Sequence, residues 1–213
     1  MTHPKLPTIV LVSSLIISLA TNAFLIYKNT TITHHTVTEV IDGDTVVIDN
    51  NQTVRLIGIE APELGFCGGQ ESKTYLTNLI KDQKVILTTF GVDKYARTLA
   101  LLTYFDLDVN KAMLSSGWAV YESFVGAPRD DMARESNQAM VKKKGLFSLC
   151  RLNNPDKPDC VIKGNINRDL KSYLLPSCSN YEQTMVYKDR GESWFCSEAE
   201  ARKAGYKKSE TCD

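Results

Sequence analysis

Histidine is scarce in this chain of 213 residues, and net charge is absent altogether. The three histidines are His3, His34 and His35, and all of them precede the predicted folded body. Imidazole general bases and histidine-ligated metal sites are therefore not expected in that body. The 25 basic residues balance the 25 acidic ones, so no overall positive field attracts a polyanion, and any affinity for phosphate has to be local. Carboxylates and arginines are the groups that remain for chemistry.

Cys-x-x-Cys motifs are also absent, and no histidine accompanies the cysteines, which disfavours a zinc site. The six cysteines are Cys67, Cys150, Cys160, Cys178, Cys196 and Cys212. Their even number favours disulfides formed in an oxidising compartment, with zinc binding as the minor alternative. Sequence alone does not define the pairing, but we expect Cys178 to pair with Cys196 because both lie in the small C-terminal segment.

Charged residues are missing from residues 6–27. This run is long enough to cross a bilayer, which requires about 20 apolar residues. We expect residues 1–6 to form a cytoplasmic N-terminus, 7–27 a transmembrane helix and 28–35 a polar tether. The rest of the chain would then lie outside the cytoplasm, anchored to the membrane. A cleavable signal peptide is the alternative, and it would make the protein a secreted one.

Strand and helix patterns alternate over residues 36–150. Alternating apolar residues predict three strands joined by turns at 42–43 and 49–52, then two more strands at 84–90 and 98–105. The predicted helices lie at 71–81, 109–117 and 130–144. Five strands with about three interleaved helices are typical of an α+β domain built on a five-stranded OB-type β-barrel.

A turn-rich linker, residues 151–159, separates this domain from a cysteine-containing C-terminal module at 160–213. Within the module, Ser197 and Glu200 have the spacing of a capping box, which predicts a short helix ended by Gly205. We expect a small structural module stabilised by disulfides, with binding of nucleic acid or of the cell envelope as the alternative.

Carboxylates and arginines concentrate in three short segments. These are residues 41–46 (Ile-Asp-Gly-Asp-Thr-Val), 55–63 (Arg-Leu-Ile-Gly-Ile-Glu-Ala-Pro-Glu) and 93–97 (Asp-Lys-Tyr-Ala-Arg). Oxygen ligands that suit a divalent cation, beside guanidinium groups that bind phosphate, are the groups needed for metal-assisted phosphodiester cleavage. Taken singly, each acidic residue also fits a turn, since Asp-Gly is a common hairpin dipeptide. The combination with two arginines favours a functional site.

The order and spacing of these segments resemble the staphylococcal nuclease family over residues 37–147. This resemblance implies a calcium-dependent endonuclease that acts on DNA, RNA or both, prefers single strands and leaves 3′-phosphate products. By position, the resemblance implies that Asp44, Glu60 and the backbone carbonyl of Ala61 bind Ca²⁺ directly. Asp42 would lie behind these ligands without contacting the ion. Glu60 stands where the family usually has aspartate, and we read the change as an adjustment of the ion's position, because calcium tolerates variable coordination.

The same resemblance assigns the catalytic roles. Arg55 and Arg97 match the phosphate-binding arginines, and Glu63 matches the general base that activates water. Lys94 and Tyr95 match nucleotide-contacting positions. Ala96 stands where the family has glycine, which restricts the loop if a positive φ is required there.

Tyr121 is a further candidate for substrate binding, because an aromatic ring near the end of the barrel is able to stack on a base. Packing in the core is the more common role for such a residue.

The prediction is thus a membrane-anchored or secreted metal-dependent phosphodiesterase that needs no protein partner. One alternative is a non-catalytic barrel that binds nucleic acid or protein at the cell envelope. The other is an envelope structural protein that binds no metal.

Overall fold

The computed structural model describes residue 18 and residues 33–212. The predicted membrane segment at 7–27 thus falls outside the described residues except for Ser18, and the prediction stands as it was made. In the part of the chain that is described, no helix has the length and apolar character to span a bilayer. The segment His35–Asp213 forms one compact unit, which contains both the predicted barrel and the cysteine-containing module.

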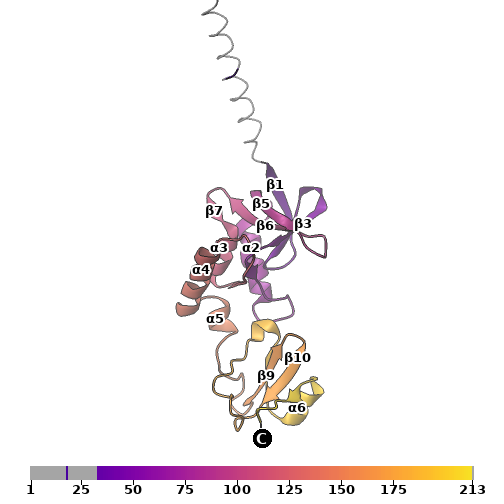
Figure 1. The fold of residues 1–213 in the computed structure, drawn as a ribbon, viewed down its shortest axis with the longest axis vertical. Helices are drawn as coiled ribbons and strands as arrows, with labels where there is room; N and C mark the ends of the chain where they lie inside the picture. The colour runs from indigo at the N-terminus through magenta and orange to yellow at the C-terminus, as the bar shows by residue number, and fades with distance from the viewer. Residues whose placement is uncertain (1–17, 19–32, 213) are drawn as a thin grey trace, which may run out of the picture. The chain divides into compact units, whose positions relative to one another are not determined.

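A closed five-stranded barrel forms the first part of this unit (Figure 1). Its strands are β1 (His34–Val40), β2 (Thr45–Ile48), β3 (Gln52–Leu56), β5 (Lys84–Val92) and β6 (Thr98–Tyr104). Neighbouring strands follow the order β3-β2-β1-β5-β6, and a parallel pairing of β3 with β6 closes the barrel. A two-residue strand, β7 (Leu107–Asp108), extends the sheet beyond β6. The five predicted strands and the OB-type barrel are confirmed.

Local sequence explains both early hairpins. The turn at 42–43 joins β1 to β2, and a single 3-10 turn, η1 (Asp49–Asn51), joins β2 to β3. Asn50 and Asn51 adopt left-handed conformations in that turn, with φ of 64° and 57°, which asparagine tolerates better than most residues. The alternating valine, isoleucine and leucine side chains of these strands fill the barrel core.

Four helices belong to the same part of the chain. They are α2 (Gly69–Ile80), α3 (Val109–Ser116), α4 (Arg129–Val141) and α5 (Leu146–Leu149). The first three confirm the predicted helices, whereas α5 was not predicted because four residues are too few to show helical periodicity. A short antiparallel pair, β4 (Ile59–Glu60) and β8 (Val120–Tyr121), lies outside the barrel.

Asn110 connects three parts of this domain from a fully buried position in α3. Its side-chain amide donates a 2.8 Å hydrogen bond to the Ile57 carbonyl, and its side-chain oxygen accepts a 3.0 Å hydrogen bond from the Leu102 amide. The segment before β4 is therefore fixed to β6 and α3, which orients the acidic residues that follow it.

The C-terminal module is built on a four-stranded sheet, which was not predicted from the sequence. Its order is β11-β9-β10-β12, formed by β9 (Ile162–Asn167), β10 (Leu170–Leu174), β11 (Ser193–Phe195) and β12 (Lys207–Lys208). The predicted short helix is present as α6 (Glu198–Lys203), where Ser197 Oγ accepts a hydrogen bond from the Glu200 amide. A 3-10 turn, η2 (Lys188–Arg190), precedes β11.

Three disulfides are present, and the expected Cys178–Cys196 pair is wrong. The bonds join Cys67 to Cys150, Cys160 to Cys196, and Cys178 to Cys212. Strand pairing explains the second and third bonds. Cys160 lies just before β9 and Cys196 directly follows β11, and these two positions meet because the strands are antiparallel neighbours. Cys178 and Cys212 follow β10 and β12, which are parallel neighbours, so both cysteines lie toward the same end of the sheet.

Candidate active site

The Asp42-Gly43-Asp44 turn packs tightly against neighbouring segments. The Asp44 amide donates a 3.0 Å hydrogen bond to Asp42 Oδ1, which holds the turn closed. A Cβ atom at Gly43 would overlap the side chains of Ser72 and Ala61. Glycine is thus required here by close approach, and the absence of a side chain allows Asp44 to lie directly against the segment that carries Ala61.

Arg55 lies between two of the predicted metal-binding carboxylates. Its Nη1 is 2.7 Å from Asp44 Oδ2, and its Nη2 is 2.5 Å from Glu60 Oε2. Asp44 also accepts hydrogen bonds from the Ala61 amide at 2.7 Å and from Thr45 Oγ1 at 3.0 Å. The structure therefore brings Asp44, Glu60 and Ala61 together, with Arg55 in the same cluster, and their role as calcium ligands stays a prediction.

Burial of the Asp44 carboxyl raises its pKa from 3.8 to about 7. The Arg55 guanidinium opposes this rise, while the negative charge of Asp42 and, more weakly, that of Glu60 add to it. Burial likewise raises the pKa of Glu60, with Arg55 again opposing and with Glu122 and Glu63 contributing to the rise. The cluster thus holds more negative charge than a single arginine compensates.

This imbalance fits a divalent cation. The available donors are carboxylate and carbonyl oxygens, which are the ligands that calcium prefers. The negative charge of Asp42 contributes to the raised pKa of Asp44. Within residues 33–212, no three acidic, histidine or cysteine side chains are already arranged as a ligand cluster. Glu60 is directed to Arg55 instead, so binding of an ion there requires Glu60 to change its contacts.

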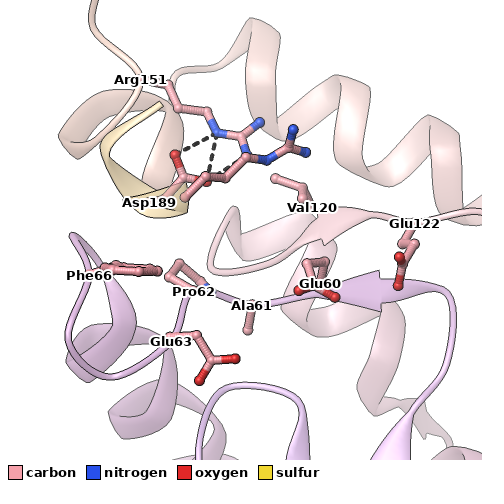
Figure 2. A pocket seen from close by; sticks show the side chains of 10 residues that line it. Glu60, Ala61, Pro62, Glu63, Phe66, Val120, Glu122, Arg151 and Asp189 are labelled. Atoms are coloured by element: carbon pink, nitrogen blue, oxygen red, sulfur yellow. Dashed lines mark hydrogen bonds and ion pairs between the residues drawn. The ribbon is translucent and has the colours of Figure 1, made fainter. Parts of the chain in front are cut away.

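Glu63 borders a pocket of about 310 Å³ next to this cluster (Figure 2). The lining residues are Glu60, Ala61, Pro62, Glu63, Phe66, Val120, Glu122, Arg151, Asp189 and Arg190. In Figure 2, Arg151 and Asp189 lie across the pocket from Glu63. The predicted general base is thus exposed beside the predicted calcium ligands, where it is accessible to water and to substrate.

Arg97 belongs to a different contact group, in the loop between β5 and β6. Its Nε lies 2.8 Å from Asp93 Oδ2, and the amides of Tyr95 and Arg97 both donate to Asp93 Oδ1. Lys94 and Arg97 each lie over the exposed Tyr95 ring, at 4.9 and 5.4 Å from its centroid. None of the contacts described for Arg97 reaches Asp44, Glu60 or Glu63.

Strand pairing nevertheless places this loop near the cluster. Leu99 in β6 pairs with Arg55 in β3, so Arg97 precedes the partner of Arg55 by two residues. In the same loop, Ala96 has a φ of 61°, in the left-handed region that glycine adopts more easily. The suspected backbone requirement at Ala96 is therefore present.

Tyr121 is half-buried and packs against the barrel core, which agrees with the structural alternative. It also borders a second pocket of about 270 Å³, together with Phe147, Arg151 and Arg190. Packing and a substrate contact are thus compatible at this residue, and its role in binding stays a prediction.

Four charged residues of the pocket were not foreseen: Glu122, Arg151, Asp189 and Arg190. Glu122 follows β8, and only the pairing of β8 with β4 places it beside Glu60. Asp189 and Arg190 reach the pocket through folding of the C-terminal module, whereas Arg151 directly follows the disulfide-bonded Cys150. Nothing in their local sequence signals a place in the pocket.

The protein is thus a small OB-type barrel in which carboxylates and a buried arginine lie beside a pocket. These groups are the ones that phosphodiester chemistry requires. Residues 53–149 match the family model described as staphylococcal nuclease homologue. The chain is 35% identical over 127 residues to an uncharacterized endonuclease of Haemophilus influenzae, covering 57% of this chain and 68% of that protein. It is 34% identical over 126 residues to a micrococcal nuclease of Shigella flexneri, covering 53% and 72% of the two chains. The protein belongs to the staphylococcal nuclease family.

Proposed function

We propose that this protein is a calcium-dependent endonuclease that hydrolyses phosphodiester bonds of DNA, RNA or both and leaves 3′-phosphate products. The observation that carries the proposal is the cluster in which Arg55 bridges Asp44 and Glu60, beside the pocket that exposes Glu63. Relatives named as endonucleases, and the membership of the family, support the reaction class.

Positive charge is the first requirement of this chemistry, because negative charge increases on the phosphate oxygens as the transition state forms. Arg55 and Arg97 would bind those oxygens through their planar guanidinium groups, which donate two hydrogen bonds to one phosphate. Asp44, Glu60 and the Ala61 carbonyl would hold calcium, which when bound supplies further positive charge at the phosphate. Arg55 must then exchange at least one of its present carboxylate contacts for substrate.

Glu63 would act on water. Glu63 lines the pocket, and its carboxylate would accept a proton from the water molecule that attacks the phosphorus. The leaving oxygen on the 5′ side takes up a proton as the bond breaks, and the phosphate remains on the 3′ oxygen. Lys94 and Tyr95 are exposed beside Arg97, which suits contacts to the neighbouring nucleotide.

We also propose that the nuclease works outside the cytoplasm, as a membrane-anchored or secreted protein. All six cysteines are paired in disulfides, which supports folding in an oxidising compartment. The uncharged run at 6–27 supports export.

The test compares the purified full-length protein with its Glu63→Gln variant on a labelled single-stranded oligonucleotide, in calcium and in chelator. We expect calcium-dependent cleavage to 3′-phosphate ends, and a loss of about two to four orders of magnitude in kcat for the variant. Glu39→Gln is the matched control, because Glu39 is exposed on β1 and does not border the pocket. Folded wild-type protein that binds the oligonucleotide without cleaving it would indicate a binding barrel instead.

A further inference from the structure

The C-terminal module is attached to the nuclease domain by a buried ion pair at the catalytic pocket. Arg151 donates to both carboxylate oxygens of Asp189, at 2.5 and 3.0 Å, and the Asp189 side chain is only 3% exposed. The Arg151 guanidinium also lies 4.7 and 5.4 Å from the ring centroids of Tyr187 and Phe147. Such a two-point contact fixes orientation as well as distance.

Two backbone contacts flank this ion pair. The Lys188 amide donates a 3.2 Å hydrogen bond to the Cys150 carbonyl. On the other side, a Cβ atom at Gly191 would lie 2.8 Å from Cζ of Phe66, so the module's backbone lies directly on a pocket-lining ring. The turn η2 is therefore held at both ends against the nuclease domain.

The contacts of η2 with the nuclease domain place Arg190 at the edge of the pocket. It lies between the buried Asp189 and the tightly packed Gly191, yet its own side chain is exposed and borders the pocket that contains Glu63. Its guanidinium lies 5.5 Å from the Tyr187 ring centroid, and within the described chain it forms no ion pair. A guanidinium held in place without an anionic partner is available to an anion.

The charges around the pocket favour such a role. Glu60, Glu63 and Glu122 border it, whereas Arg151 and Asp189 neutralise each other. A polyanionic strand that approaches Glu63 is repelled by these carboxylates unless a free cation compensates. On the described pocket wall, Arg190 is the cation that is not already paired.

Arg190 also borders the second pocket, together with Tyr121 and Phe147. It therefore lies where the catalytic pocket and an aromatic-lined pocket meet. A strand that leaves the catalytic pocket in this direction would pass the guanidinium before reaching aromatic rings on which a base is able to stack.

We propose that Arg190 of the C-terminal module binds a phosphate group of the substrate strand next to the scissile phosphate, so that the module forms part of the nucleic-acid site. This inference rests on the proposed nuclease function. It assigns Arg190 a role in binding and positioning, since the reacting phosphate itself is proposed to contact Arg55 and Glu63.

The experiment measures cleavage of a single-stranded oligonucleotide and of bis(p-nitrophenyl) phosphate, a diester without flanking phosphates, by the full-length protein. For Arg190→Ala we expect kcat/KM on the oligonucleotide to fall about tenfold, through loss of one charged hydrogen-bond contact. The slope of log kcat/KM against log salt should become shallower by about 0.7. Activity on the small diester should not change, because it offers no flanking phosphate, and Arg190→Lys should recover part of the loss.

Arg168→Ala is the matched control, as it removes the same charge from an exposed turn of the same module that does not border the pocket. Equal losses in Arg168→Ala and Arg190→Ala, or an equal loss on both substrates, would overturn the inference. Fluorescence anisotropy with labelled single-stranded DNA separates the two proposals. If the wild type does not cleave, the proposed function fails, whereas unchanged DNA affinity in Arg190→Ala refutes the phosphate contact.

Discussion

Protonation of Asp44 should control how the stability of the metal-free protein depends on pH. The folded carboxyl has a pKa of about 7, compared with 3.8 for an exposed aspartate. As the pH rises, the Asp44 carboxyl therefore ionises at a lower pH in the unfolded chain than in the folded protein. The contribution of Asp44 to the free energy of unfolding is complete below about pH 4 and is lost as the pH rises to about 7. The difference in pKa corresponds to about 4 kcal/mol, at about 1.4 kcal/mol per pKa unit.

The test is chemical denaturation of the wild type and of Asp44→Asn in the presence of chelator. It is carried out at about pH 4.5 and about pH 8, roughly the two sides of the Asp44 titration. The asparagine does not ionise, so the free energy of unfolding of the wild type should fall relative to the variant by about 2–4 kcal/mol between the two conditions. Loss of the Arg55 contact in the variant adds an offset at both pH values, which cancels in the comparison. Calcium should restore stability to the wild type at the higher pH and leave the variant unchanged.

Parallel pH profiles of wild type and variant in chelator would refute this reasoning. They would mean that Arg55 and the Ala61 amide stabilise the Asp44 anion as well as water does.

Two further substitutions test the surrounding framework. Ala96→Gly should stabilise the protein by about 0.5–1 kcal/mol in a denaturant titration, because Ala96 is exposed and its positive φ is strained for alanine; a destabilised variant would contradict this. Asn110→Ala should lower the free energy of unfolding by about 2–4 kcal/mol, since it leaves the Ile57 carbonyl and the Leu102 amide without their buried partner; a loss below about 1 kcal/mol would indicate that water replaces the side chain.

Short-range geometry explains which parts of the site were predictable. Asp44 lies beside Arg55 because the next residue, Thr45, pairs with Arg55 in the hairpin of β2 and β3. Such a hairpin is readable from alternating apolar residues and turn residues. A positive φ at Ala96 was suspected because alanine stands where the resembling family has glycine, and the φ of 61° bears this out. In these places a few neighbouring residues determine the structure.

Long-range packing explains what was not predictable. The pairing of Cys178 with Cys212 depends on the parallel contact of β10 and β12, and β12 has only two residues, too few for a sequence pattern. Asp189 and Arg190 likewise enter the pocket through an ion pair to a residue 38 positions earlier in the chain. No local pattern of apolar or turn residues encodes contacts of this range.

The Cys67–Cys150 disulfide has a mechanical consequence for the pocket. Cys67 directly follows Phe66 and Cys150 directly precedes Arg151, so the bond joins two facing parts of the pocket wall at their neighbouring residues. The width between these parts is restrained covalently rather than by packing alone. We therefore expect the enzyme to accommodate different strands by rotation of exposed side chains such as Arg190, with little opening of the backbone.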